Sequence, residues 1–109
     1  MPKILIITTP QKWEEAVAEG HYRRDDLATE GFIHASRPDQ LPWVVENFYK
    51  GQTELVVLRI DTEKLTSPLK WESPPGMDDV FPHLYGPLNL DAVIKVEPLE
   101  DVLAGRAGD

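Results

Sequence analysis

The segment Thr29-Glu30-Gly31-Phe32-Ile33-His34-Ala35-Ser36 organises this sequence, because it places a histidine and a serine two positions apart at the end of a short apolar run. Residues two apart in a strand point to the same face, so a strand over residues 32–35 predicts that His34 and Ser36 project together. Another histidine embedded in apolar sequence lies far downstream, in Phe81-Pro82-His83-Leu84-Tyr85-Gly86-Pro87-Leu88. We therefore expect the two segments to meet across a cleft, with His34 and His83 as neighbours.

The length of 109 residues suits one domain whose core needs neither disulfides nor metal. We expect residues 1–109 to form this domain, with residues 104–109 as a frayed tail because they have nothing large to bury. Hydrophobic residues make up 41% and charged residues 28%, as is typical of a soluble globular protein. Ten prolines are roughly twice the usual share of about 5%, which favours ordered loops.

Charge and cysteine content narrow the possible partners. The formal net charge of −8 argues against nucleic acid, since non-specific binding depends on Lys and Arg neutralising phosphates. The absence of cysteine excludes a thiol nucleophile, thiolate zinc sites and disulfides. No apolar run approaches the roughly 20 residues that cross a bilayer, and the run after Lys3 is too short for a signal peptide. We expect a cytoplasmic protein with a small-molecule partner and no membrane contact.

Local patterns in the first half predict alternating strands and helices. Residues 3–8 are apolar on both faces, as in a strand buried on both sides. Residues 10–19 have helical spacing, with Thr9 as N-cap and Gly20 as the C-terminal stop. The polar residues 21–29 are predicted to form a loop. The Ser36 hydroxyl is predicted to cap the next helix by accepting from the Asp39 amide, and the apolar stripe of that helix is Leu41, Val44, Val45, Phe48 and Tyr49, ending at Gly51.

The second half is predicted to be mostly strand. Residues 53–60 form the strongest strand pattern, residues 69–72 alternate, and residues 73–79 contain adjacent prolines and a glycine that favour a loop. Extended segments are expected at 81–85 and 92–96. The element order predicts an α+β fold, with a small, strongly bent, split mixed sheet and two N-terminal helices.

The segment around His83 is predicted to form a rigid pocket wall. His83, Tyr85 and Phe81 share one face of an alternating segment, and Pro82 and Pro87 stiffen it. Aromatic and histidine side chains held in this way suit stacking on a planar ring. A surface corner with partly buried aromatics stays open as the simpler interpretation.

Two carboxylates lie at the edges of these apolar motifs. Glu30 precedes the His34 strand and Glu72 ends the strand over residues 69–72, so either is a candidate to orient a histidine or to accept from a ribose-like diol. No local spacing resembles a metal-ligand pair, and no metal is predicted. Two alternatives stay open: Ser36 acts only as a helix cap, and His34 is a core histidine satisfied by backbone groups.

These residues resemble a known family, the small bacterial and plant proteins grouped as domain of unknown function 952 (DUF952). The matching residues follow in order along nearly the whole chain: Trp13, residues 30–36, 55–61, 71–72, 81–88 and 91–93. The resemblance implies a fold similar to that of ADP-ribosyltransferases, with a bent sheet around a cleft where those enzymes hold NAD. It also implies that His34, Ser36 and His83 line a cleft for a nucleotide-like ligand such as NAD or ADP-ribose.

One position departs from the family pattern. Members typically carry a histidine in the first strand, and the corresponding residue here is Ile6, which cannot donate to a ribose hydroxyl. Glu72 is the candidate for the catalytic glutamate of the transferases. Three functions follow as hypotheses: a pocket protein that binds a small ligand through Glu30, His34, Ser36, His83 and Tyr85, a group-transfer enzyme of ADP-ribosyltransferase type, and a protein-interaction module.

Overall fold

The computed structural model describes residues 3–23 and 25–105 of the chain. The predicted tail is therefore described only at residues 104 and 105, which form a turn, and the rest of it lies outside the described residues. The strands are β1 (Lys3–Thr8), β2 (His21–Tyr22), β3 (Ile33–His34), β4 (Val56–Asp61), β5 (Leu69–Glu72), β6 (Phe81–Leu84), β7 (Leu88–Asn89) and β8 (Val93–Pro98). The helices are α1 (Pro10–Glu19), α2 (Asp25–Glu30), η1 (Pro38–Gln40), α3 (Leu41–Phe48), η2 (Thr62–Lys64), η3 (Leu90–Ala92) and α4 (Leu99–Leu103).

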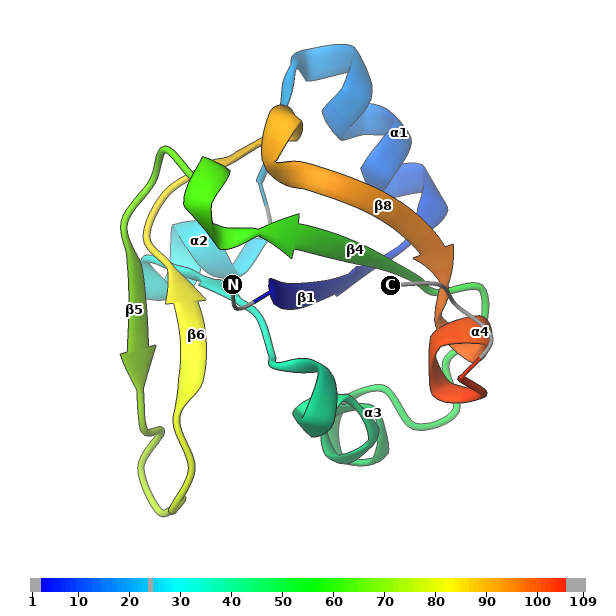
Figure 1. Cartoon of the computed structure of the whole chain (residues 1–109), viewed down its shortest axis with the longest axis vertical. Coiled ribbons are helices and arrows are strands. Elements are labelled where there is room, and N and C mark those ends of the chain that lie inside the picture. Colours follow the sequence, from blue (N-terminus) through cyan, green and yellow to red (C-terminus); the bar gives the residue numbers. More distant parts are fainter. Residues whose placement is uncertain (1–2, 24, 106–109) are drawn as a thin grey trace.

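The fold is α+β, and its described strands form three antiparallel sheets in place of the single mixed sheet that the sequence predicted. Their orders are β1-β4-β8, β2-β7 and β3-β6-β5. In Figure 1 the first sheet lies at the centre, and the β5–β6 hairpin stands beside it. The chain leaves one sheet for another within two residues, because Ala35 N–H bonds to Pro82 O at 3.2 Å whereas Ser36 pairs with Leu5.

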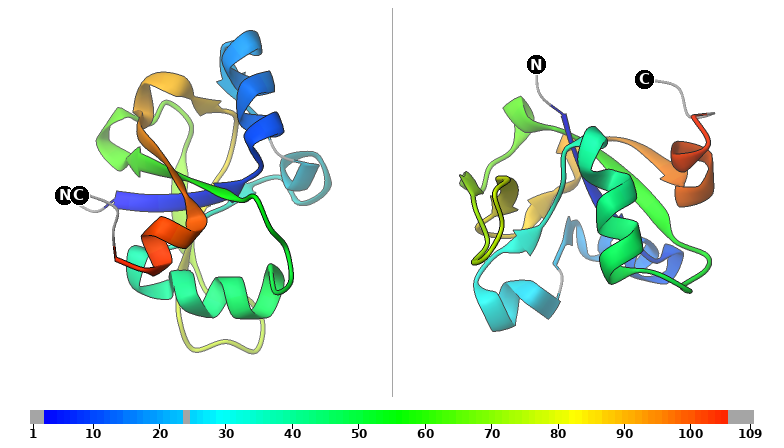
Figure 2. Two further views of the ribbon diagram at one scale, coloured as in Figure 1. Left: turned by 90° about the vertical axis from the view of Figure 1, so that its right-hand side faces the viewer. Right: turned by 90° about the horizontal axis from the view of Figure 1, so that it is seen from below.

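Strands β1 and β4 of the central sheet are buried on both faces, as their continuous apolar sequences predicted, whereas the edge strand β8 is mostly exposed. Alternate residues of β1 enter different core clusters: Ile4 and Ile6 pack with Leu58 and Ile60, and Leu5 packs on the opposite face. The first cluster is covered by α1, and α3 and α4 lie on the other side of the sheet, as the views of Figures 1 and 2 agree. Period-two burial thus divides one strand between two cores.

Helix α1 has the bounds and the caps that the sequence predicted. Thr9 Oγ1 accepts from the backbone N–H of Lys12 at 3.1 Å, and Pro10 fills the first helical position. Gly20 has φ +89°, a left-handed conformation that favours glycine, and its N–H donates to Ala16 O at 2.8 Å. These interactions are local, which is why sequence rules found them.

The prediction of a loop over residues 21–29 was wrong, because β2 and α2 form there. Tyr22 is buried at 1% exposure, and its hydroxyl donates to Thr8 Oγ1 at 2.8 Å. That hydrogen bond joins β2 to the end of β1. Strand β2 also pairs with β7. The start of the polar segment 21–29 is therefore held by a long-range contact of Tyr22, which local composition does not reveal.

The predicted Ser36 cap was also wrong. The backbone of Ser36 forms a bridge with Leu5, with N–H···O distances of 2.9 and 2.8 Å, and the residue is 3% exposed. The residue that precedes η1 is Arg37, whose backbone N–H donates to Gln40 Oε1 at 2.9 Å. Tertiary pairing has displaced the local capping box that the sequence favoured.

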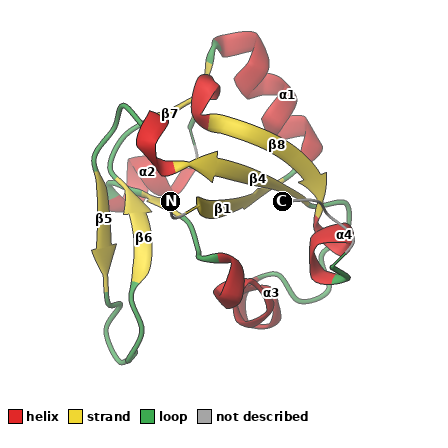
Figure 3. Ribbon diagram, viewed as in Figure 1, coloured by secondary structure: helices red, strands yellow, loops and turns green. Residues whose placement is uncertain are grey.

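From α3 onward the predicted elements are present with shifted ends. Helix α3 ends at Phe48, with Tyr49 N–H donating to Val45 O at 3.0 Å, before the predicted stop at Gly51. Helix α4 was not predicted, and it is fixed where Leu99 N–H donates to Leu55 O at 2.9 Å. Figure 3 shows that the helices are short and that loops join most elements. None of the helices in the described ranges has the length and apolar character to cross a membrane.

Candidate functional site

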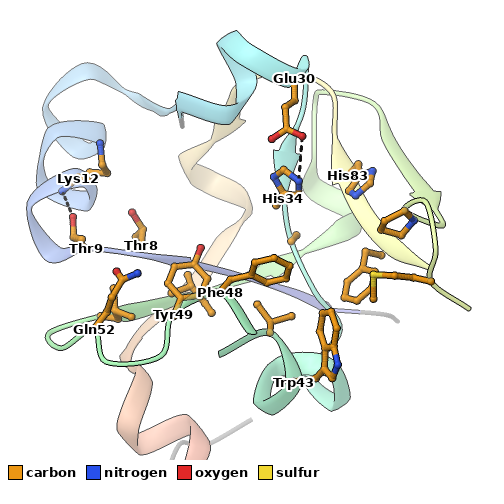
Figure 4. A pocket seen from close by; sticks show the side chains of 17 residues that line it. Thr8, Thr9, Lys12, Glu30, His34, Trp43, Phe48, Tyr49, Gln52 and His83 are labelled. Carbon is orange, nitrogen blue, oxygen red and sulfur yellow. Dashed lines mark hydrogen bonds and ion pairs between the residues drawn. The ribbon is translucent and has the colours of Figure 1, made fainter. Parts of the chain in front are cut away.

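A cavity of about 730 Å³ opens between α3 and the strands β3 and β6. Its walls also include the end of β1, the start of α1, and the loop between β5 and β6. In Figure 4, Glu30, His34 and His83 lie along the upper side, and Trp43, Phe48 and Tyr49 lie along the lower side. The volume falls within the usual range of about 300–1,000 Å³ for small-molecule sites.

His34 and His83 are neighbours, as expected from the two motifs. They face each other as antiparallel partners of β3 and β6, and their ring centroids are 5.5 Å apart at an interplanar angle of 74°. Both side chains line the cavity. The expectation that they meet across a cleft needs correction, because strand pairing sets them side by side on one wall.

His83 is held directly by two neighbours, Phe32 and Glu72, and Tyr85 holds Glu72 in turn. His83 is 5% exposed, and Phe32 stacks on its ring at a centroid distance of 4.0 Å and an angle of 14°. Its Nδ1 lies 2.8 Å from Glu72 Oε1. The same carboxylate oxygen accepts from the Tyr85 hydroxyl at 2.5 Å. The imidazole therefore has a fixed place in the wall, which argues against a freely rotating side chain.

The electrostatics of Glu72 follow from these contacts. The hydrogen bond from Tyr85, and then that from His83, hold the pKa of the Glu72 carboxyl below its usual value, because both stabilise the ionised form. The same bond raises the pKa of Tyr85, since the phenol must give up its donor to ionise. Near neutral pH the pair is thus a carboxylate and a neutral phenol, and Glu72 can only accept hydrogen bonds.

His34 is more loosely held than His83. Its Nε2 lies 3.8 Å from Glu30 Oε1, and the two side chains are 48% and 51% exposed. Glu30 is the last residue of α2, and the turn at Gly31, with φ +87°, returns the chain into β3. The contact is an ion pair only while His34 is protonated, and a pair this exposed contributes little to stability.

Aromatic side chains form the wall opposite the histidines. The ring centroid of Trp43 lies 5.7 Å from that of Phe48 and 5.8 Å from that of Phe81. Phe48 is 65% exposed although the helix stripe predicted it to be buried, and Trp43 is 42% exposed. The prediction that Phe48 is buried was wrong, because α3 places this side chain at the cavity and not in the core. Large exposed rings beside a cavity are typical of binding surfaces.

The loop between β5 and β6, which supplies Pro74 and Met77 to the cavity, is fastened to η1 by a polar clasp. Two side chains bind the Asp79 carboxylate: Arg37 through Nη2 at 3.0 Å, and Gln40 through its amide nitrogen at 2.9 Å. The bond from Gln40, and then that from Arg37, lower the pKa of Asp79, whereas the pKa of Arg37 is raised first by its bond to Asp39 and then by the bond to Asp79. Ionic hydrogen bonds of this kind hold the loop over one side of the cavity.

The family model described as "Protein of unknown function (DUF952)" matches residues 7–96, which is most of the chain. The chain belongs to the DUF952 family. Among solved structures it is similar to the crystal structure of CC0527 from Caulobacter crescentus, with 33% identity, coverage of 88% of this chain and 84% of that chain, and a TM-score of 0.79. The solution structure of CC0527 has 33% identity, coverage of 90% and 84%, and a TM-score of 0.77.

No curated protein matches this DUF952 chain. No ADP-ribosyltransferase is among the matching structures named above. The family membership expected from the sequence motifs is therefore confirmed. Membership of this family indicates the fold, but it assigns no activity.

The structure separates the predicted site residues of this DUF952 domain into two groups. Glu30, His34 and His83 line the cavity. Glu72 and Tyr85 are not among the lining residues, and they support His83 through the hydrogen bonds of the Glu72 carboxylate. Ser36 is buried, is not itself a lining residue, and pairs with Leu5 through its backbone.

The first strand also meets the cavity at other positions than the resemblance implied. Ile6 has no exposed surface and belongs to the first core cluster, whereas Ile7 and Thr8 line the cavity. A side chain at position 6 therefore points into the core on the α1 side of the sheet. The missing histidine at this position leaves the cavity walls unchanged.

Sequence reasoning missed several members of the site. Phe32 could have been found, because it is two residues before His34 and so shares its face, and the two rings are 4.9 Å apart. Trp43 lies outside the predicted apolar stripe of its helix, and an aromatic on the polar side of a helix was the available signal. Lys12 and Met77 reach the cavity from segments that carry no local sign of it.

Proposed function

We propose that this DUF952 domain is a cytoplasmic pocket protein that binds a small, planar, nucleotide-like ligand of the NAD or ADP-ribose type. The observation that carries the proposal is the shared cavity in which His34 and His83 lie opposite the aromatic wall of Trp43 and Phe48. Aromatic walls bind planar rings by stacking, and the few polar groups fix the orientation of the ligand. The likeness of the fold to ADP-ribosyltransferases, which the resemblance implies, is part of this proposal.

The two ends of the cavity carry different chemical groups, and the proposed ligand would contact both ends. A ring would lie between the histidines and the aromatic wall, with Glu30 available to accept from a ribose hydroxyl. The opposite end is polar, with Thr8, Thr9 and Lys12 among its lining residues. Lys12 is the basic side chain at this end, and it suits the phosphate of a nucleotide.

Thermal unfolding with added NAD or ADP-ribose tests the proposal. A ligand at about 100 times its dissociation constant should add roughly 2.7 kcal/mol of stability. Trp43→Ala should remove that gain, because it deletes part of the aromatic wall. Trp71→Ala is the matched control, since Trp71 is exposed to a similar degree, 39% against 42%, and does not line the cavity.

Both variants should unfold close to the wild type, because neither tryptophan is fully buried. No stabilisation by either nucleotide at millimolar concentration would refute nucleotide binding. Equal loss of the ligand effect in both variants would show that the cavity is not the site.

A second candidate is favoured by one contact, the 2.8 Å bond between His83 and Glu72. A carboxylate on Nδ1 is a common way to orient a histidine that transfers protons, and it suits a group-transfer enzyme of ADP-ribosyltransferase type. Incubation with NAD should then release nicotinamide, and Glu72→Gln should abolish the release. If the wild type releases no nicotinamide, ligand binding without a reaction remains the proposal. If no small ligand stabilises the protein either, a protein-interaction module is the remaining hypothesis.

A further inference from the structure

The hydrogen bond between Glu72 and His83 determines where the proton of His83 resides. A carboxylate can only accept, so the Nδ1 that lies 2.8 Å from Glu72 Oε1 must carry the hydrogen. A neutral imidazole has a single N–H, and its other nitrogen is then a bare acceptor. The tautomer of a histidine is set in this way by the partner of one ring nitrogen.

The other ring nitrogen of His83, Nε2, lies on the part of the ring away from the Glu72 bond. His83 lines the cavity, whereas Glu72 does not, so the two nitrogens have different surroundings. Within residues 3–23 and 25–105, the hydrogen bond of the His83 side chain is the one between Nδ1 and Glu72. Phe32 covers one face of the ring and the residue is 5% exposed, and a half-turn of the ring would break the Nδ1 bond to Glu72, so this bond fixes which nitrogen lies on the Glu72 side.

We propose that His83 presents an unprotonated Nε2 to the cavity, and that the cavity therefore selects a ligand whose ring edge carries an N–H or O–H donor. This inference rests on the proposed function, and it narrows the ligand to planar rings with an amine, amide or hydroxyl group. Tyr85 and Glu72 are positioning residues in this arrangement, because they act on the ligand only through His83.

The chemistry of the walls agrees with a donor-bearing ring. A ring bound between Trp43 and the histidines would meet Nε2 of His83 as an acceptor that no other group among the described residues occupies. A ring edge that offers only acceptors would face this nitrogen without a hydrogen bond. The desolvated acceptor would then lose the partner it had in water, which lowers affinity.

The first test needs no ligand. Long-range ¹H–¹⁵N spectra of ¹⁵N-histidine-labelled protein are recorded near pH 8, above the usual histidine pKa of about 6.5, and assigned with His21→Asn and His34→Asn. We expect the His83 pattern of a protonated Nδ1 and a bare Nε2. A protonated Nε2 in the wild type would overturn the inference.

Two variants separate the proton-fixing role from mere packing. Glu72→Gln introduces an amide that can donate to Nδ1, so the His83 signals should change to a mixture of tautomers or to Nε2–H. Tyr85→Phe removes the second hydrogen bond of Glu72 but keeps the carboxylate, so the Nδ1–H tautomer should persist. An unchanged tautomer in Glu72→Gln would mean that Glu72 does not fix it, and would also overturn the inference.

The second test uses matched fragments, phenol against anisole and benzamide against N,N-dimethylbenzamide. Binding is measured from NMR shifts at the cavity, and each donor should bind at least about tenfold more tightly than its methylated partner. Methylated fragments that bind equally well or better would overturn the inference and leave the cavity as a ligand site. Failure of every fragment to bind at millimolar concentration would count against the proposed function itself, and this inference would fall with it.

Discussion

Gly86 is the position where a single methyl group should disturb the site most strongly. It follows Tyr85, has φ +151°, and a Cβ placed on it would collide with Ser67 Oγ and lie 2.8 Å from Ser67 Cβ. Ser67 cannot easily withdraw, because its hydroxyl donates to Pro87 O at 2.7 Å. A change to alanine must therefore move the backbone of one segment or the other.

The expected cost of Gly86→Ala can be worked from these contacts. Overpacking costs about 1–3 kcal/mol. An alanine at a backbone angle that L-residues avoid adds about 1–3 kcal/mol, and loss of the Ser67 hydrogen bond adds about 1 kcal/mol. We expect the free energy of unfolding to fall by about 3–7 kcal/mol, a large part of the about 5–15 kcal/mol that stabilises a typical domain.

Urea unfolding of the purified variants measures this loss. Gly51→Ala is the matched control, because Gly51 has φ +82° but nothing lies within 4 Å of the place its methyl group would take. The control should lose only the backbone cost of about 1–2 kcal/mol. Adding Ser67→Gly to Gly86→Ala should recover part of the loss, as a double-mutant cycle would show. Equal losses in the two glycine variants, or no recovery, would refute the steric argument.

Two further predictions concern the loop clasp and the first helix. The folded-state pKa of Asp79 lies below its ordinary value of 3.8, so its contribution to stability is complete above that pH and is lost as the pH falls through the lowered pKa. Asp79→Asn should therefore be less stable than the wild type above pH 3.8, with the gap closing in acid, and a constant gap across an acid titration of stability would contradict the role of the Arg37 pair. Thr9→Ala should lower the free energy of unfolding by about 1 kcal/mol in urea melts because it removes the cap on Lys12 N–H, whereas Thr9→Ser should keep it.

The sequence located both histidines of the site, but it did not determine which carboxylate bonds which histidine. His34 and His83 were found from apolar sequence around polar side chains, and strand pairing does bring them together. Their carboxylate partners were named, but which of them bonds which nitrogen depends on the register of β5 against β6, where Lys70 lies opposite His83 and Glu72 lies opposite Phe81. A shift of one residue would have moved Glu72 to the other face.

The errors in the predicted fold share one cause. The loop over residues 21–29 and the cap at Ser36 were judged from local composition, yet Tyr22 is ordered by Thr8, and Ser36 is paired with Leu5. Phe48 was assigned to the core by helical spacing, which identifies an apolar stripe but not what lies opposite it. Here a cavity lies opposite part of the stripe.

The sequence by itself determined the features that short-range physics controls. The apolar strands β1 and β4 are buried on both faces. Helix α1 begins after Thr9 and ends at Gly20, because the capping hydrogen bonds of these two residues join groups at most four residues apart. Only the tertiary structure decided that Ser36 belongs to a bridge, that Trp43 and Phe48 face a cavity, and that Glu72 fixes His83. Those contacts join distant segments, and their geometry depends on how the sheets pack together, which no local pattern records.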